Sequence, residues 1–538
     1  MTVFLWVNEM VKKLLAMLLT LALTAVPAGN GYWSVNGRNI VSPDGSITML
    51  KGMGFGNNVW ENDISGVLRH HSEQSYKELS ELGFDSVRFY LNYRWFESDD
   101  APYSYREEGF EMLSRNIAWA KKYGIGLILN MHYPEGGYQS QGNGMELWTD
   151  KENKKRLTAL WGEIAKRYSG ENTIIGYGLI NEPVVPANGS YAQSVSVCHT
   201  LMQSIADEIR RYDKNHILFI ESVGGVKDMS TGEMTWGLPD DGNILINDKN
   251  TVYEFHFYEP FNFTHQVAGA GVCYPDESLY VTEMENGWTG GTELKSSSPE
   301  NGWRYFESDS LTADESRNII YPNLCVWNTG NGTAYFDDVA LKEISPDGAV
   351  RIVYSEDFAN GTSPASTWSA DGSGEAHYSA AEGYKSRGCL AVSGADEGFT
   401  ATMATVPMRE GYRYVLSGYV LNESTGSAYI SAGYALAKGF HAIDSEYLRE
   451  KLDYILQFRD RNNVPVYLGE FGADNNAAGA LGGEKWAADV IDWCLDNGIA
   501  FSYHVYHEPL FGFYPDDNDY TGTGRRELLA DMFRRKLT

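Results

Sequence analysis

Two glutamates, each placed where an apolar stretch ends, are the residues of this chain best suited to chemistry. Glu182 follows the run Ile174–Ile180 and precedes Pro183, which cannot continue a hydrogen-bonded ladder. Glu470 ends the run that begins at Val464 in the same way. Because an ionised carboxylate is costly to bury inside a strand, both side chains are expected at strand ends that face a cleft. The pattern predicts two carboxylates that act together.

The segments around these glutamates alternate between strand-like and helix-like patterns. Six strand–helix units occur in residues 29–275, and two more occur in residues 436–538. Eight such units are typical of a closed barrel, in which the carboxyl ends of the strands form the face that carries the chemistry. The predicted fold class is therefore α/β, a (β/α)8 TIM barrel.

Residues 276–435 interrupt this alternation. They contain short alternating strands separated by turns rich in Gly, Ser, Asn and Asp, and they show no helical periodicity. This pattern is typical of an all-β sandwich. We therefore expect a jelly-roll sandwich inserted in the loop after the sixth barrel strand.

Charge and composition narrow the class of partner. The chain has 43 basic and 72 acidic residues, a net charge of −29, which disfavours binding to nucleic acid or to an anionic membrane. A neutral polymer is not repelled, and the 13% of aromatic residues offer flat rings that suit sugar faces. A neutral substrate fits the composition best.

The amino end resembles an export signal. Lys12 and Lys13 precede an apolar run from Leu14 to Val26, and small residues follow it, so residues 1–28 are predicted to be a cleaved signal peptide. Met10 is an alternative start, and an uncleaved signal anchor is the alternative interpretation. We expect a secreted or periplasmic protein that has no membrane contact after cleavage.

Five cysteines are too few and too scattered for a disulfide framework or a zinc site. Cys325 and Cys389 could pair with each other, but their spacing leaves this open.

Several strand-end motifs together resemble glycoside hydrolase family 5, the cellulase family of retaining (β/α)8 glycosidases. The resemblance covers residues 31–275 and 436–538 and involves motifs in the expected order. These motifs are Val87-Arg88, Met131-His132-Tyr133, Asn181-Glu182-Pro183, His256-Phe257-Tyr258 and Gly469-Glu470-Phe471-Gly472.

The resemblance implies a role for each of these residues. Glu182 would be the general acid/base and Glu470 the nucleophile, while Asn181 would hold the sugar 2-hydroxyl. Further substrate-binding roles follow for Arg88 and Tyr258, which would position Glu470, and for His132 and His256, which would line the subsite at the cleavage point.

Elementary electrostatics agrees with these roles. Retaining cleavage requires the two carboxyl groups to stand about 5–5.5 Å apart. Arg88 would lower the pKa of Glu470 and keep it ionised as a nucleophile. Glu182, with no cation expected beside it, would keep its proton near neutral pH.

Other polar strand-end residues have plainer interpretations. Glu221 and Glu254 are expected to be ordinary solvated residues. His132 and His256 could be hydrogen-bonded core histidines, and metal ligation is disfavoured because no carboxylate pair at ligand spacing accompanies them. No metal ligand is therefore assigned in the barrel.

Aromatic residues near the expected cleft are less informative. Trp60 and Trp148 are candidate sugar platforms, although core packing is an equal alternative. The eighth strand departs from the family pattern, because Tyr503-His504 stands where many members place a tryptophan. His504 is then a candidate substrate-binding residue, and the sugar and linkage preference stays open.

The insertion has a resemblance of its own. Residues 335–341 resemble the last strand of the jelly-roll carbohydrate-binding modules of families 4, 9 and 22, whereas residues 355–418 resemble the start of such a module. We infer a circular permutation. Sugar binding and a purely scaffolding role remain alternatives. The resemblance also implies a possible structural calcium site, with candidate ligands Asp337, Asp338, Glu356 and Asp357.

Together these features predict a secreted, monomeric, retaining endo-β-glycanase that needs no cofactor for catalysis. β-1,4-Glucan is the preferred substrate, with mannan and β-1,3 or mixed-linkage glucan as alternatives on the same mechanism. A non-catalytic polysaccharide-binding protein and a carboxylate-based metallohydrolase are the alternatives from other classes.

Overall fold

The computed structural model describes residues 31–538 except 62–63, 65–69, 237–241, 267–271, 282–288, 298, 360–365, 369–373, 381–382, 385–387, 396–397, 403–404, 438–439 and 517–523. The predicted signal peptide, residues 1–28 with the alternative start at Met10, lies outside the described residues. The chain divides into two units, Met1–Tyr274 with Leu448–Thr538, and Pro275–Tyr447. Each unit is described by itself.

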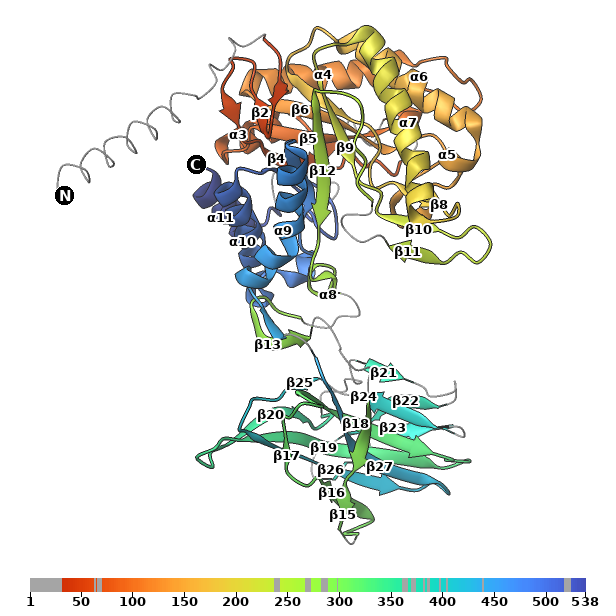
Figure 1. The fold of residues 1–538 in the computed structure, drawn as a ribbon, viewed down its shortest axis with the longest axis vertical. Coiled ribbons are helices and arrows are strands. Elements are labelled where there is room, and N and C mark those ends of the chain that lie inside the picture. The colour runs from red at the N-terminus through yellow and green to blue at the C-terminus, as the bar shows by residue number, and fades with distance from the viewer. Residues whose placement is uncertain are drawn as a thin grey trace, which may run out of the picture. The chain divides into compact units, whose positions relative to one another are not determined.

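Eight parallel strands of the first unit close into a barrel, as predicted (Figure 1). Around the barrel the order is β12-β29-β30-β4-β5-β6-β7-β9. The strands are β4 (Lys51–Phe55), β5 (Ser86–Asn92), β6 (Gly126–Tyr133), β7 (Ile174–Gly178), β9 (Ile217–Glu221), β12 (Thr251–Phe257), β29 (Val466–Phe471) and β30 (Ala500–Tyr503). In chain order β12 is the sixth barrel strand and β29 the seventh, so the second unit is inserted between them.

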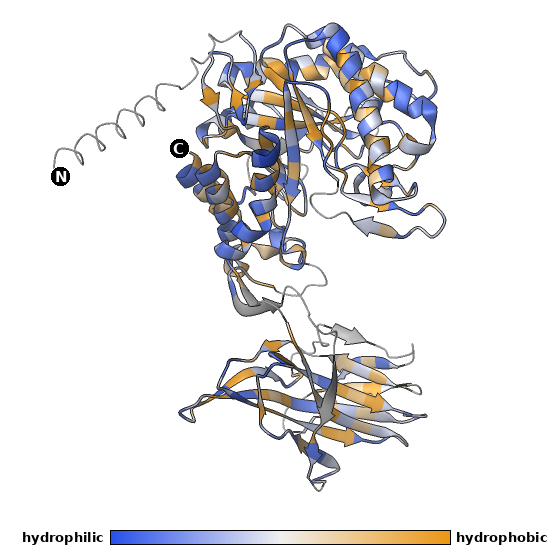
Figure 2. Cartoon of the chain, in the orientation of Figure 1, coloured by the Kyte–Doolittle hydropathy of each residue, from blue (hydrophilic) through white to orange (hydrophobic). Residues whose placement is uncertain are grey.

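Helices cover the outside of the barrel. The long ones are α3 (Glu73–Glu81), α4 (Glu107–Tyr123), α6 (Lys151–Tyr168), α7 (Tyr191–Tyr212), α9 (Ser445–Asn462), α10 (Gly483–Asn497) and α11 (Glu527–Leu537). In α7 the Ser190 side chain accepts a hydrogen bond from the Gln193 backbone and so caps the first turn. Hydrophobic residues are concentrated on the barrel strands, whereas hydrophilic residues recur along the helices (Figure 2).

The hydrophobic core of the barrel lies toward the amino ends of its strands. Ile128, Ile175 and Ile217, near the starts of β6, β7 and β9, pack together with Tyr467 of β29. A three-stranded sheet formed by β1 (Ser34–Asn36), β2 (Asn39–Val41) and β3 (Ile47–Thr48) contributes Ile40 to this cluster. The apolar filling leaves the carboxyl ends of the strands for polar side chains.

A small sheet is built from the loops that follow β7 and β9. Its strands are β8 (Val184–Pro186), β10 (Gly225–Lys227) and β11 (Met234–Trp236). Strand β10 pairs in parallel with β8 and antiparallel with β11. Because β8 begins two residues after Glu182, this sheet borders the strand end that carries the first candidate carboxylate.

The second unit is a β-sandwich, as predicted. One sheet has the order β14-β27-β18-β24-β21 with β25 beside β18, and the other has the order β15-β16-β26-β19-β23-β22 with β17 and β20 at its side. Their bounds are β14 (Thr289–Glu293), β15 (Lys295–Ser296), β16 (Trp303–Glu307), β17 (Leu311–Thr312), β18 (Ile319–Trp327), β19 (Thr333–Ile344), β20 (Val350–Glu356), β21 (Ser366–Trp368), β22 (Glu375–Ser379), β23 (Cys389–Ser393), β24 (Phe399–Thr402), β25 (Val406–Pro407), β26 (Arg413–Asn422) and β27 (Ser427–Ala435).

Residues of both sheets share one core. Leu324 and Ile430 of the first sheet pack with Phe336 and Leu416 of the second. Near the two ends of this unit, β13 (Asp276–Val281) pairs antiparallel with β28 (Phe440–Ile443). The identity of the sandwich as a carbohydrate-binding module and its circular permutation stay predictions.

No disulfide joins Cys325 and Cys389, which are both buried, so the pairing that the sequence left open is not formed. None of the described helices combines the length and the hydropathy needed to cross a membrane.

Candidate active site

Arg88 is the central cation of a polar cluster at the carboxyl ends of the barrel strands. It lies on β5, is completely buried, and its Nη1 stands 2.6 Å from Glu470 Oε1. Its Nη2 donates a hydrogen bond of 2.7 Å to Asn181 Oδ1, and its Nε forms an ion pair of 2.6 Å with Glu254. Arg88 therefore links the ends of three other barrel strands to its own.

Glu470, the last residue but one of β29, is held on several sides. Tyr258 donates a hydrogen bond of 3.0 Å to its Oε2, and Tyr90 donates one of 3.1 Å to its Oε1. Burial raises the pKa of Glu470, but the positive charges of the neighbouring histidines and of Arg88 outweigh it and hold the pKa well below its usual value. The carboxylate is thus ionised and aligned.

Glu182 stands just beyond the end of β7 with a φ of 41°, a left-handed conformation that is rare for a residue with a side chain. Its Oε1 lies 2.8 Å from His256 Nδ1, and Ser140 donates a hydrogen bond to its Oε2. Its backbone N–H donates a hydrogen bond of 2.8 Å to Glu221 Oε2. The side chain is 31% exposed, which leaves it access to a ligand in the cleft.

The expectation that no cation stands beside Glu182 is wrong. Burial raises the pKa of Glu182, but the hydrogen bond and the charge of His256 outweigh this effect, and the pKa is lowered. The sequence could not reveal this contact, because His256 is contributed by β12. Glu182 and His256 are better treated as a pair that shares one proton.

His256 contacts both candidate catalytic groups, and these two contacts set an upper limit on the distance between them. Its Nδ1 lies 2.8 Å from Glu182 Oε1 and 3.6 Å from Glu470 Oε2. The two oxygens are therefore at most about 6.4 Å apart, the sum of those two distances. This limit includes the separation of about 5–5.5 Å seen in retaining glycosidases and lies below the range that begins at about 6.5 Å in inverting ones.

Glu221 and Glu254 are not solvated residues, which corrects the sequence interpretation. Glu221 is 6% exposed and Glu254 is 1% exposed, and both contact Arg88. Burial, together with the charges of Glu254 and Glu182, raises the pKa of Glu221 well above its usual value despite His256 and Arg88. Glu221 is therefore neutral under conditions in which Glu470 is charged.

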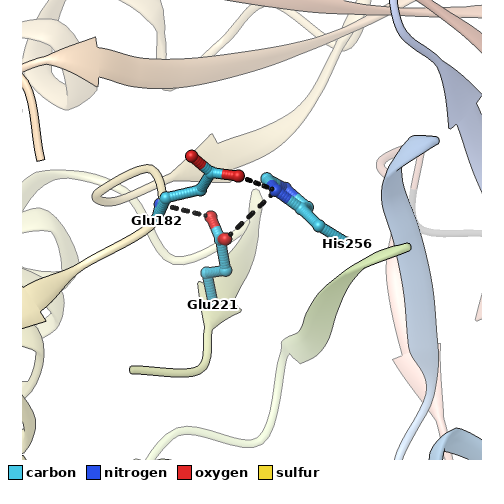
Figure 3. A group of neighbouring side chains, drawn as sticks. All are labelled: Glu182, Glu221 and His256. Atoms are coloured by element: carbon cyan, nitrogen blue, oxygen red, sulfur yellow. Dashed lines mark hydrogen bonds and ion pairs between the residues drawn. The ribbon is translucent and has the colours of Figure 1, made fainter. Parts of the chain in front are cut away.

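Glu182, Glu221 and His256 form a compact group (Figure 3). Their potential ligand atoms all lie within 4.8 Å of one another, so the group could hold a metal ion. This differs from the sequence argument, which assumed that no carboxylate pair accompanies the histidines. The direct contact of 2.8 Å between His256 and Glu182 also satisfies both groups by hydrogen bonding alone.

The remaining predicted residues gather around the same centre, with one exception. His132 stacks on Tyr90 with ring centroids 4.1 Å apart, and burial lowers its pKa to about 3, so its ring is neutral. His504 Nδ1 lies 2.9 Å from Tyr90 Oη. Trp60 is 48% exposed beside the cleft, whereas Trp148 is buried and donates a hydrogen bond to Gln139. Trp148 is thus a core residue.

A cavity of about 700 Å³ opens over the cluster. Glu182, Glu470 and Trp60 line it. A hollow of about 650 Å³ between α6 and α7 shares none of these residues. The volume over the two carboxylates is in the range of small-ligand sites.

Sequence reasoning missed several members of this site: Tyr90, Ser140, Glu221, Glu254 and Trp236. Only Tyr90 carried a usable signal, because it follows Arg88 by two positions and must share its face of β5.

Residues 41–307 match the profile of the family described as cellulase, glycosyl hydrolase family 5. The chain is 36% identical over 199 residues to endoglucanase C of Acetivibrio thermocellus, a match that covers 37% of this chain and 53% of the relative. It is 28% identical over 272 residues to a β-xylosidase of Phanerodontia chrysosporium, covering 43% of this chain and 53% of the relative.

An endoglucanase from the hyperthermophilic Thermotoga maritima aligns with a TM-score of 0.47 and 17% identity, over 90% of this chain and 96% of the other. The chain spans about half the length of the curated relatives that it matches, 53% for both of those named above.

Proposed function

We infer that this chain is a member of the cellulase family of glycoside hydrolases (family 5) and acts as a retaining endo-β-glycanase. One observation carries the inference. Glu182 and Glu470, from two different strand ends, stand at most about 6.4 Å apart across His256. Such a pair can attack an anomeric carbon and protonate the departing oxygen at the same time.

In the first step Glu470 forms a bond to the anomeric carbon while the bond from that carbon to the glycosidic oxygen breaks. The electron pair of the broken bond stays on the oxygen, which takes a proton from Glu182. The hydrogen bonds from Arg88, Tyr90 and Tyr258 fix the attacking carboxylate and keep it ionised. The product of this step is a glycosyl ester of Glu470.

In the second step water attacks the same carbon and gives its proton to Glu182, and Glu470 leaves as a carboxylate. Inversion at the carbon occurs twice, so the configuration is retained. Asn181 Nδ2 has no hydrogen-bond partner among the described residues, although Asn181 is fully buried. This amide supports a role in holding a sugar hydroxyl at the cleavage point.

The Glu182–His256 pair supplies the proton. Without substrate the pair is charged, since the pKa of Glu182 is lowered by His256. A sugar in the cavity displaces water, and desolvation favours the neutral form of an ion pair. The proton then resides on Glu182 when it is needed and leaves with the glycosidic oxygen in the first step. In the second step the attacking water gives a proton to Glu182, and this proton restores the charged pair by passing to His256 when the products leave and water re-enters.

The proposed substrate is a neutral β-linked polysaccharide, with β-1,4-glucan preferred. The net charge of −29 and the similarity to an endoglucanase support this choice. Mannan and β-1,3 or mixed-linkage glucan remain alternatives, since His504 stands where many family members place a tryptophan. We further propose secretion, guided by residues 1–28.

We propose that the second unit either binds polysaccharide or serves only as a scaffold. We also propose that it holds a structural calcium ion. The possible ligand Asp337 is fully buried, and its two carboxylate oxygens accept hydrogen bonds from the backbone of Asp338 and Tyr384. The four candidate side chains do not form a group like that around His256 in the described part of the chain. Any calcium there would need backbone oxygens as well.

The test of the proposed function is release of reducing sugar from purified β-1,4-glucan, mannan, β-1,3-glucan and mixed-linkage glucan. We expect activity on at least one polymer, with retention of the anomeric configuration in the first product seen by NMR. The substitution Glu470→Ala should abolish the release of reducing sugar from every polymer. Inversion, or full activity of Glu470→Ala, would refute the mechanism.

A metal-dependent hydrolase is the second candidate, favoured by the group formed by Glu182, Glu221 and His256. A chelator distinguishes the two. Activity that survives exhaustive treatment with a chelator but is lost in Glu470→Ala supports the glycosidase, because Glu470 is not a member of that group. Loss of activity on chelation, restored by a divalent cation, supports the metal enzyme.

A further inference from the structure

Glu221 is a buried carboxyl group that neither attacks the sugar nor donates a proton in the proposed mechanism. It is the last residue of β9 and is 6% exposed. Its Oε2 accepts a hydrogen bond of 2.8 Å from the backbone N–H of Glu182 (Figure 3). Its Oε1 lies 3.4 Å from His256 Nδ1, the same nitrogen that contacts the Glu182 carboxylate. Glu221 therefore contacts both members of the pair that supplies the proton.

The backbone around Glu182 interrupts a long parallel pairing of strands. Strand β7 pairs with β9 up to Gly178 and Phe219. Strand β8 pairs with β10 from Val184 and Gly225 onward, and the offset between partners is the same in both stretches. The two stretches are thus one ladder with a break in it, and Glu182 lies in the break. Because the ladder is intact on both sides, it fixes where the break begins and ends.

Inside the break, the N–H of Glu182 bonds to a side chain instead of a neighbouring strand. The N–H of Leu179 still bonds to the backbone of β9, whereas that of Asn181 bonds to the Met131 carbonyl of β6 at 3.0 Å. The next N–H along the chain, that of Glu182, finds its acceptor in Glu221. The carboxyl group of Glu221 thus takes the place of a strand backbone at this one position.

The break leaves Glu182 in a strained conformation. Its φ of 41° lies in the left-handed region, which is unfavourable for a residue with a side chain and persists only where the surroundings impose it. An N–H that leaves water without finding an acceptor is costly, so the bond to Glu221 favours this conformation over those that turn the N–H elsewhere. The next residue, Pro183, has no N–H that could provide a second anchor. Since φ determines where the side chain points, the bond to Glu221 also directs the carboxyl group of Glu182.

We propose that Glu221 is a positioning residue for the proton donor. Its carboxyl oxygen holds the backbone of Glu182 in the left-handed conformation that points the Glu182 side chain at the glycosidic oxygen. Glu221 acts through this hydrogen bond and not through transfer of its own proton. The inference rests on the proposed function and assigns to β9 a residue on which proton transfer to the leaving group depends.

Three substitutions separate the reach of the side chain from its charge. Glu221→Gln keeps an oxygen in reach of the Glu182 N–H. Glu221→Asp keeps the carboxyl group but is one methylene shorter, so its oxygens fall short of that N–H. Glu221→Leu keeps much of the volume and has no acceptor. If Glu221 acts by position, the Gln variant should resemble the wild type and the Asp variant should resemble the Leu variant. Should Glu221→Leu not fold, the comparison of Asp with Gln carries the test.

The step that should slow is cleavage of bonds whose leaving group needs a proton. The ratio kcat/KM reports the first step, in which Glu182 acts as the acid. We expect Glu221→Leu and Glu221→Asp to lower kcat/KM for cellohexaose about 10²-fold, the cost of a donor misplaced by about 1 Å. For a dinitrophenyl β-cellobioside the loss should stay below about threefold, because this leaving group departs without a proton. Glu221→Gln should stay within about threefold of the wild type on both substrates.

A matched control and a double variant show whether the effect passes through Glu182. Asp85 also accepts a backbone N–H of a neighbouring strand, that of Lys51 at 2.7 Å, but at the amino end of the barrel and outside the cavity. Asp85→Leu should lower stability without changing the ratio of the two kcat/KM values. In Glu182→Ala the donor is absent, so the addition of Glu221→Leu should cause no further loss on cellohexaose. An additive loss, an equal loss on both substrates, or a Gln variant as slow as the Leu variant would overturn the assignment.

Crystal structures of the variants separate this inference from the proposed function, because the backbone conformation needs no turnover. The φ of residue 182 should stay near 41° in Glu221→Gln and become negative in Glu221→Leu and Glu221→Asp. If the wild-type chain cleaves no polymer while φ responds in this way, the hydrolase proposal fails and the control of the Glu182 backbone by Glu221 stands. If φ stays left-handed in the Leu and Asp variants, the role of Glu221 is refuted whatever the activity.

Discussion

Replacement of Arg88 by methionine is the perturbation that probes the charge cluster most directly. Methionine keeps much of the length and apolar volume of arginine but removes its charge. Glu470 and Glu254, which both stand 2.6 Å from the guanidinium, would then be buried without their cation. We expect a large loss of stability of the barrel at neutral pH.

The expected loss in the free energy of unfolding can be estimated in two ways. Each contact at 2.6 Å is worth about 6 kcal/mol at an effective dielectric constant of about 20, before the desolvation cost of the guanidinium is subtracted. A stranded carboxylate can instead bind a proton, which at pH 7 costs about 3.7 kcal/mol for a group with an ordinary pKa of about 4.3. We therefore expect a net loss of about 3–5 kcal/mol.

The loss of stability in Arg88→Met should be smaller at acidic pH than at neutral pH. In the native protein the pKa of Glu470 is held below its usual value, so the stability it contributes is present above the unfolded pKa and is lost as the pH falls through the folded pKa. In Arg88→Met the carboxyl of Glu470 loses the guanidinium that lowers its pKa, so acidification relieves the cost of burying it. The difference between the two proteins should shrink by about 2 kcal/mol or more between pH 7 and pH 4.5.

Calorimetry at both pH values measures the effect, because the barrel and the sandwich can unfold in separate transitions. Arg156→Met is a matched control, since Arg156 is 6% exposed, pairs with the buried Glu97, and lies outside the cavity. Both variants should be destabilised, but only Arg88→Met should also move the acidic limb of kcat/KM to higher pH. A destabilisation of Arg88→Met that is the same at both pH values would refute the reasoning.

Three further predictions follow from the same contacts. Glu182→Ala should slow cleavage of substrates with poor leaving groups far more than cleavage of activated aryl glycosides, by about 10²-fold or more, because only the former need protonation; equal losses in steady-state kinetics would argue against Glu182 as the acid. Glu135 is fully buried, and burial raises its pKa well above the usual value, so the stability it contributes is lost as the pH rises from the unfolded pKa through the folded one. In Glu135→Gln the transition temperature of the barrel should therefore fall less steeply with rising pH. A fall as steep as in the wild type would contradict this. If the sandwich holds calcium, a chelator should lower the temperature of its own transition while that of the barrel stays constant, and Asp337→Asn should remove the chelator effect.

The sequence predicted the barrel and the residues at its strand ends because these depend on local pattern. A parallel strand buried on both faces reads as a continuous apolar run, and the first polar residue after it marks the end where neighbouring strands converge. The pair Asn181-Glu182 and Glu470 are of this kind, whereas His256 lies within β12 and was indicated by the family resemblance. Arg88 is an exception within a buried strand, and its charge signals that acidic partners must lie nearby.

What the sequence could not predict depends on contacts between distant strands. Glu221 and Glu254 look like solvated strand-end glutamates, because nothing local shows that Arg88 and His256 will cover them. The pairing of His256 with Glu182 likewise arises only when β12 and β7 take their places in the closed barrel. Trp60 and Trp148 have similar loop contexts in the sequence, yet one is open to the cleft and the other is packed inside.

The antiparallel pairing of β13 with β28 bears on how such a chain could arise and fold. Because the paired strands run side by side, the two junctions of the sandwich stand about one interstrand spacing apart, about 5 Å. Once the sandwich is folded, its two ends lie close together, so it connects β12 to β29 as a short loop would. The conformational entropy lost when these two strands pair is then set by that short span and not by the number of residues in the sandwich. The sandwich could therefore be removed, or replaced by another domain whose two ends are adjacent, without a change in the register of the barrel strands.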